Sequence, residues 1–211
     1  MNKILVVLAI LLVFGAVLFF VGQPPKNTLS TGLSTNGLTA PQANFSDDFQ
    51  RLTGRWQAAN VVPNGLDIDA VSFENASAEQ LASAKTDFES MAEQLTNPAA
   101  RDLAAVYARM ASALLATKEL KDRDAELSQV APGEVCGQQG LFSLTGSAIN
   151  AKVVRLTELQ AQLALFQSMH PDEAKDAGLS GVAVKLDDDS ALAGEFSKAL
   201  SDLKTACGGS A

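Results

Sequence analysis

The sequence is poor in the residues from which metal and redox centres are usually built. It contains two cysteines and one histidine in 211 residues. Thiolate zinc clusters need more cysteines, and c-type haem attachment needs a Cys-x-x-Cys-His motif. The sequence therefore excludes both, and a single histidine makes a histidine-based metal site a poor interpretation.

Basic residues are also scarce relative to acidic ones. The chain has 16 Lys and Arg against 24 Asp and Glu, so its formal net charge is -8 and its pI is about 4.6. Proteins that bind nucleic acids use clustered Lys and Arg to neutralise phosphates. We therefore expect no nucleic-acid partner.

Familiar catalytic motifs are missing too. The sequence has no Gly-x-Ser-x-Gly elbow, no Gly-rich phosphate loop with a lysine and no His-Glu-x-x-His pair. A Ser-His-Asp triad, or a cysteine nucleophile with a histidine base, would have to use His170. This residue stands between the end of a predicted helix and Pro171, where capping the helix is the simpler role. We predict no catalytic, metal-binding or cofactor-binding residues.

The sequence does contain one long apolar run. Ile4–Gly22 contains no polar side chain, and as a helix it would be about 28 Å long, close to the ~30 Å hydrocarbon core of a bilayer. The amino terminus and Lys3 give it a positive flank, and Lys26 is the only charge between the run and Asp47. This pattern predicts a single-pass helix in the cell membrane, with a cytoplasmic N-terminus and an extracytoplasmic C-terminal domain.

The same run is open to a second interpretation as a cleaved signal peptide. The apolar region of a signal peptide usually spans about 7–15 residues, and this one is longer. The small residues that cleavage requires are also poorly placed, because bulky Phe20 precedes Gly22. We prefer a retained signal-anchor, and a secreted or periplasmic protein is the alternative.

A polar linker follows the membrane segment. Gln23–Asn44 begins with two prolines and is rich in Ser, Thr, Gly and Asn, so it cannot bury enough apolar surface to offset its ordering entropy. We predict a flexible tether with an r.m.s. span of roughly 25 Å. Asn44 and Asn75 each begin an Asn-x-Ser pattern and are candidate glycosylation sites in an organism that glycosylates exported proteins.

From Phe45 onward the apolar residues recur at helical spacing. Ser46 is a candidate cap for a first helix, and Ser77 with Gln80 forms a capping box for a second. Asn97 followed by proline predicts the start of a third helix immediately after the second, and hence a tight helical hairpin. In the third helix, the polar Thr117 interrupts the apolar stripe.

Two further helices complete the predicted domain. A long helix runs from about Leu141 to Met169, weakened locally by Gly146, and a last helix follows the acids Asp187–Asp189. These acids suit a helix N-terminus better than a metal site, because consecutive side chains diverge. Since every helix has one apolar stripe, the helices must bury their stripes against each other. We predict an all-α, antiparallel bundle of four main helices, with the Ser46 helix as a fifth.

Each of the two cysteines lies at the end of a predicted helix. Cys136 precedes the long helix and Cys207 ends the last one, so antiparallel packing brings both to the same pole. Export would place them in an oxidising compartment. A bridge closing about 70 residues would stabilise the fold by roughly 4 kcal/mol in the chain-entropy model. We predict a disulfide. Two free buried thiols are the alternative, and a redox-active pair is disfavoured because no Cys-x-x-Cys motif is present.

These observations divide the chain into four parts: a transmembrane signal-anchor (1–22), a flexible linker (23–45), an extracytoplasmic helical bundle (46–207) and a tail (208–211). We interpret the protein as a non-enzymatic binding component, or a structural or assembly component, of the cell envelope, with a protein partner that the sequence does not identify. A secreted or periplasmic soluble binding protein is the first alternative. An enzyme that uses carboxylates, for example acids such as Asp67 and Asp69, is the second.

Overall fold

The computed structural model describes residues 44–61 and 76–208. The predicted membrane segment, most of the linker, Asn75 and the acids Asp67 and Asp69 lie outside these residues. Among the helices of the described ranges, none combines the length and the apolar character that crossing a membrane requires.

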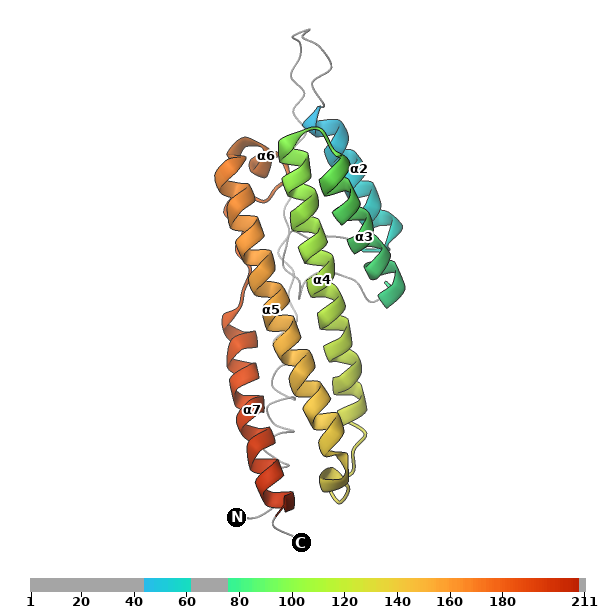
Figure 1. The fold of residues 1–211 in the computed structure, drawn as a ribbon, viewed down its shortest axis with the longest axis vertical. Helices are drawn as coiled ribbons and strands as arrows, with labels where there is room; N and C mark the ends of the chain where they lie inside the picture. The colour runs from blue at the N-terminus through green and yellow to red at the C-terminus, as the bar shows by residue number, and fades with distance from the viewer. Residues whose placement is uncertain (1–43, 62–75, 209–211) are drawn as a thin grey trace, which may run out of the picture.

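The described part of the chain is a helical bundle built around one long antiparallel pair, and no strand occurs in it (Figure 1). The predicted all-helical, antiparallel architecture is therefore confirmed. The elements are α2 (Phe45–Ala58), α3 (Ala78–Gln94), α4 (Pro98–Leu127), the 3-10 helix η1 (Val135–Gln138), α5 (Gln139–Met169), α6 (Pro171–Asp176) and α7 (Asp187–Gly208).

Helices α4 and α5 run the length of the molecule, and the other helices cover different halves of this pair (Figure 1). Helices α2 and α3 lie against the N-terminal half of α4. Helix α7 lies against the N-terminal half of α5. We call the end where α7 meets η1 the η1 pole, and the opposite end, which carries α6, the α6 pole.

Local capping signals explain where several helices begin. The Ser77 hydroxyl accepts a hydrogen bond from the Gln80 backbone N–H at 3.1 Å, and the Gln80 side chain accepts one from the Ser77 backbone N–H at 2.8 Å. This capping box was predicted. The Asn97 side chain likewise accepts a bond from the Ala100 N–H at 3.0 Å, and α4 then starts at Pro98.

The cap of α2 differs from the prediction by two residues. Asn44, not Ser46, is the cap, and its side-chain oxygen accepts a hydrogen bond from the Ser46 N–H at 3.2 Å. Both residue types are good caps. Asn44 takes the role because its own backbone is extended, with φ -76° and ψ 117°, while Ser46 already lies in the helix.

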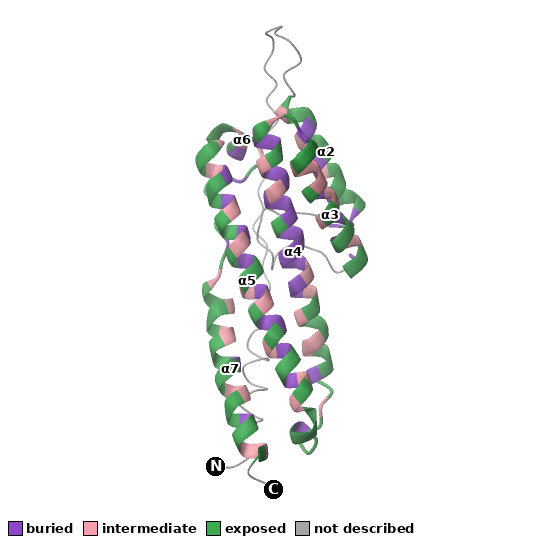
Figure 2. Cartoon of the chain, viewed as in Figure 1, coloured by how far each residue is buried: buried purple, intermediate pink, exposed green. Residues whose placement is uncertain are grey.

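The core consists of two clusters of buried residues, which share α4 and α5 (Figure 2). The larger lies towards the α6 pole, and at its centre Trp56, Phe88 and Tyr107 contact one another with ring centroids 4.7–5.7 Å apart. Burial also raises the pKa of the Tyr107 hydroxyl far above its ordinary value.

The smaller cluster joins α7 to α5 near the η1 pole. Its buried members include Phe142, Ile149, Phe196 and Leu203. At Gly146 the two helices approach so closely that a Cβ atom would lie 3.2 Å from the Phe196 ring. The glycine that weakens α5 locally therefore also makes room for its neighbour.

Thr117 corrects the predicted end of the apolar side of α4. We expected this side to fade at Thr117, but the residue is 4% exposed. Its hydroxyl donates a hydrogen bond of 2.8 Å to the Ala113 carbonyl one turn back. With the hydroxyl satisfied inside its own helix, threonine packs as a small, largely apolar side chain.

Candidate functional site

The most distinctive surface of the described chain is on α5, the helix at the centre of the fold. Four large apolar side chains are exposed there: Leu144 by 53%, Val154 by 52%, Leu165 by 55% and Met169 by 63%. In the described ranges, no other large apolar side chain is exposed to this degree. The exposed apolar surface is therefore concentrated on one helix rather than scattered.

These side chains belong to a regular stripe, which we call the α5 outer face. Its eight positions follow alternating steps of three and four residues, the spacing of a coiled-coil seam. All eight are exposed or half-buried: Leu144, Ser147, Ala151, Val154, Glu158, Ala161, Leu165 and Ser168. Met169 continues it at the α6 pole. Phe142, Ile149, Leu156 and Leu163, which form the buried side of α5, lie on a different face of the helix.

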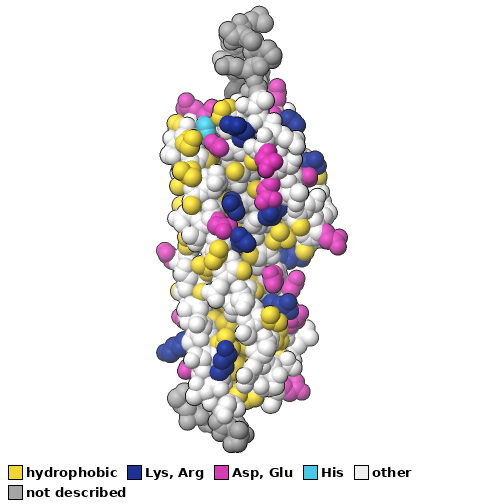
Figure 3. Space-filling model, in the orientation of Figure 1, with side chains coloured by type: hydrophobic (Ala, Val, Ile, Leu, Met, Phe, Trp, Pro, Cys, Tyr) yellow, Lys and Arg dark blue, Asp and Glu magenta, His cyan; other side chains and the backbone are white. Residues whose placement is uncertain are grey.

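A small ionic cluster lies at the middle of the α5 outer face. The Glu158 carboxylate is 2.9 Å from the Arg155 guanidinium on the same helix and 3.3 Å from the Arg109 guanidinium on α4. All three side chains are one third to one half exposed, so each ion pair contributes little to stability. In the space-filling view, hydrophobic side chains gather over the upper part of α5, and acidic and basic side chains lie together below them (Figure 3).

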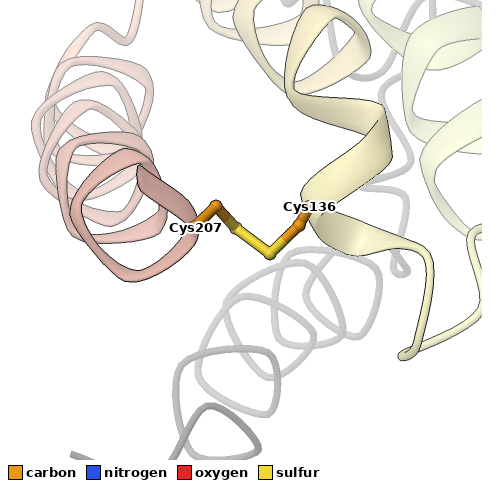
Figure 4. The surroundings of a disulfide bond; sticks show 2 residues. All are labelled: Cys136 and Cys207. Carbon is orange, nitrogen blue, oxygen red and sulfur yellow. A yellow bond between two sulfur atoms is a disulfide. The ribbon is translucent and has the colours of Figure 1, made fainter. Parts of the chain in front are cut away.

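The two cysteines meet at the η1 pole, as predicted. Their sulfur atoms are 2.06 Å apart and their Cα atoms 5.4 Å apart, which are disulfide distances (Figure 4). Cys136 lies in η1 and is exposed, whereas Cys207 lies in the last turn of α7 and is half-buried. The bridge therefore fastens the end of α7 to the start of α5 at a position that solvent reaches.

His170 does more than end a helix. It caps α5, and its backbone N–H donates to the Phe166 carbonyl. However, its side chain is only 14% exposed, and Nε2 lies 2.8 Å from a carboxylate oxygen of Asp102 on α4. The predicted role of a surface cap is thus incomplete, because the pair also connects α4 to α5 at the α6 pole. The sequence does not reveal this contact, because the two residues lie 68 positions apart in the chain.

A second polar contact across helices was not predicted. The Lys152 ammonium of α5 is 2.8 Å from the Asp189 carboxylate in the first turn of α7, and their side chains are 8% and 13% exposed. The three acids Asp187–Asp189 do lie at a helix N-terminus as expected. The third acid, Asp189, also forms an ion pair with the buried Lys152 of α5. This pair depends on how the two helices pack and cannot be read from the sequence.

The described residues contain no group of three or more His, Cys, Asp and Glu side chains that could hold a metal ion. An open depression of about 570 Å³ lies between α5 and the start of α7, lined by Gln160, Val184, Lys185, Leu186, Asp187 and Asp188. Burial raises the pKa of one carboxyl, Asp124, but that residue lies on α4 and does not line the depression.

The candidate glycosylation site at Asn44 is exposed at the first end of the described chain. Its side-chain oxygen caps α2, and a sugar would attach to the side-chain nitrogen, so capping and glycosylation are chemically compatible. Modification of Asn44 stays a prediction, and Asn75 lies outside the described residues.

The α5 outer face was missed at the level of sequence, although its signal is present there. Leu144, Val154 and Leu165 follow one another at ten and eleven residues, about three helical turns each, and together they mark a second apolar side of the same helix. Comparison with known protein families, with curated proteins and with solved structures finds no match to this chain.

Proposed function

We propose that this chain is a membrane-anchored binding or assembly component of the cell envelope, whose helical domain acts outside the cytoplasm through its surface and without catalysis. The observation that carries the proposal is the α5 outer face. Exposed apolar side chains grouped on one face, with charges beside them, are typical of protein interaction sites.

Two other features support the location. The apolar run Ile4–Gly22 has the length of a membrane-spanning helix. The Cys136–Cys207 pair at disulfide distance suits an oxidising compartment outside the cytoplasm. A domain on a tether of about 22 residues could reach partners in the same membrane or close to it.

The proposal is tested by photo-crosslinking in membranes of the organism that makes the protein. A photoreactive amino acid replaces Val154 in the full-length chain, and the same amino acid replaces exposed Thr86 of α3, a helix that does not carry the outer face, as the matched control. We expect a specific adduct from position 154 and none from position 86. Equal labelling from both positions, or no adduct from either, would contradict a binding role for this face.

Mass spectrometry of the mature N-terminus tests the anchor itself. Recovery of the Ile4–Gly22 segment in the membrane fraction supports the retained anchor. A mature chain that begins downstream of Gly22 and fractionates with soluble proteins would instead support the secreted or periplasmic alternative.

A further inference from the structure

We propose that the Cys136–Cys207 bridge is a redox-sensitive latch: a dithiol reductant opens it in the folded protein and thereby frees the C-terminal half of α7 from the η1 pole. The packing and exposure around the bridge carry this inference, which uses neither the α5 outer face nor the membrane segment. The latch can therefore fail its test while the proposed function stands, and the proposed function can fail while the latch stands.

The bridge is open to attack on the side of η1 (Figure 4). Cys136 is exposed, and Gly137 and Gln138 beside it in η1 are exposed as well. Cys207 is half-buried and packs against the smaller core cluster. Disulfides that solvent reaches are the ones that thiols reduce without unfolding the protein, and these are often regulatory. The sulfur of Cys136 is therefore the atom that a reductant attacks.

The C-terminal half of α7 has little else to hold it in place. Beyond Phe196, the only buried side chain of this helix is Leu203, which packs in the smaller cluster with Val135 and Phe142. Residues 197–208 form about three helical turns. A helix of this length is marginal by itself, and one buried leucine offsets little of its ordering entropy. The cystine therefore supplies much of the constraint on this half of α7.

The N-terminal half of α7 is held by contacts that do not involve the cystine. The Asp189 carboxylate is 2.8 Å from the Lys152 ammonium of α5, and both side chains are largely buried. One to two turns further on, Phe196 packs over Gly146 of α5. These contacts remain when the bridge opens, so the movement is confined to the part of α7 beyond Phe196. It uncovers apolar surface at the η1 pole, and it leaves the larger core cluster near the α6 pole intact.

Opening is a thiol–disulfide exchange in two steps. A thiolate of the dithiol attacks the Cys136 sulfur, the S–S bond breaks, and Cys207 leaves with the bonding electron pair and takes up a proton. The second thiol of the reductant, as a thiolate, then attacks its own sulfur in the mixed disulfide and releases Cys136. The reductant is oxidised by two electrons to a disulfide, and the cystine is reduced to two thiols. The bridge is the substrate of the reductant in this scheme, so it needs no Cys-x-x-Cys motif of its own.

Reduction of the full-length chain in detergent by dithiothreitol tests the accessibility of the bridge. Thiols are alkylated at successive times and counted by mass. We expect two labels per chain, at a rate that stays constant when urea is added below the concentration that unfolds the protein. A rate that rises with urea in parallel with unfolding would show that the bridge reacts only in unfolded chains and would overturn the inference.

Glutathione, a monothiol, tests which sulfur is attacked. After rapid alkylation, peptide mapping of the trapped intermediate should find glutathione on Cys136 and the alkyl label on Cys207. The opposite arrangement would place the attack on the half-buried sulfur and contradict the geometry proposed for the latch.

Hydrogen exchange by mass spectrometry compares the oxidised chain with the chain reduced by dithiothreitol. Exchange in residues 197–208 should become about tenfold faster or more, while peptides from α3 and the first turns of α7 stay unchanged. Removal of the reductant and reoxidation should restore the slow exchange. The Cys136→Ser, Cys207→Ser double variant is the matched control: its residues 197–208 should exchange fast without reductant and should not respond to it. Unchanged exchange in residues 197–208 of the reduced chain, or equally faster exchange throughout the bundle, would overturn the latch.

Discussion

At the scale of the residue, Gly146 determines how closely α7 can approach α5. The Phe196 ring lies over the position where a side chain would begin, at 3.2 Å from a Cβ atom, and Leu200 follows at 3.8 Å. Glycine in a helix interior costs about 1 kcal/mol relative to alanine. The close contact of α7 gives this glycine a structural role that offsets the cost.

We predict that Gly146→Leu lowers the free energy of unfolding by about 2 kcal/mol, because the new side chain would overlap the Phe196 ring. Gly194→Leu is the matched control. Gly194 lies in the interior of α7 with nothing within 4 Å of its Cβ position, so this substitution should stabilise by a few tenths to about 1 kcal/mol. Urea unfolding followed by circular dichroism measures both, and equal effects would mean that α7 does not pack over Gly146.

Tyr107 gives the fold a defined response to alkali. The Tyr107 side chain is buried, and burial raises the pKa of its hydroxyl far above the ordinary value of 10.0. The folded state therefore keeps the proton where the unfolded state releases it. The contribution to stability is complete below about pH 10 and falls by roughly 1.4 kcal/mol for each pH unit above it.

We predict that ionisation of Tyr107 and unfolding occur together in alkaline titration. The chain has one tyrosine and one tryptophan, and their rings are 5.7 Å apart, so tyrosinate absorbance and tryptophan fluorescence report on the same cluster. Their transitions should coincide, well above pH 10. Tyr107→Phe should remove this part of the pH dependence and leave the part due to lysines. A tyrosinate signal that rises near pH 10 while fluorescence stays native would refute the buried hydroxyl.

At the scale of the element, α7 is the helix that depends most on the cystine. Only Phe196 and Leu203 are buried among its side chains, and its main contacts are with α5 and η1. The larger core, with Trp56 and Phe88, lies at the other end of the molecule. Loss of the Cys136–Cys207 bridge should therefore loosen one helix more than the whole bundle.

We predict that Cys136→Ser with Cys207→Ser lowers the unfolding free energy by about 4 kcal/mol in the chain-entropy model, and that α7 loses protection first. Hydrogen exchange by mass spectrometry should show faster exchange in peptides from α7 and unchanged exchange in peptides from α3 and the first half of α4. Uniformly faster exchange throughout the bundle would show instead that the two core clusters unfold as one unit.

The helices themselves were largely predictable because their signals are local. The capping box at Ser77 and the Asn97-Pro98 start define α3 and α4 within the chain's own sequence. The contacts between helices were not predictable in the same way. The Lys152–Asp189 and His170–Asp102 pairs join residues far apart in the chain, and periodicity does not give the relative rotation of two helices. The cysteine pair was predictable because only one pairing exists.

The outer face of α5 shows the same limit. The sequence indicates that α5 has apolar residues on more than one side, but it does not tell which side meets α4 and α7. Once the structure places Phe142, Ile149 and Leu163 inside, Leu144, Val154 and Leu165 remain outside. A candidate site made of a surface therefore emerges only after the core has been assigned.

At the scale of the whole molecule, the described chain begins and ends at opposite poles of an elongated bundle. The described chain begins at the α6 pole, where α2 starts, and the cystine lies at the η1 pole (Figure 1).

The location proposed for the molecule leads to a last prediction, which links its two ends. If the apolar run exports the domain, Cys136 and Cys207 will meet an oxidising environment, and a chain that lacks residues 1–22 will stay in the cytoplasm with reduced thiols. Alkylation of denatured protein without reductant should label no cysteine in the full-length chain and both cysteines in the truncated one, counted by mass. Full-length protein reduced before alkylation is the control and should take two labels. Because the reduced domain lacks the bridge, it should also unfold at a free energy about 4 kcal/mol lower. Two labelled thiols in the unreduced full-length chain would place the domain in a reducing compartment and contradict the extracytoplasmic assignment.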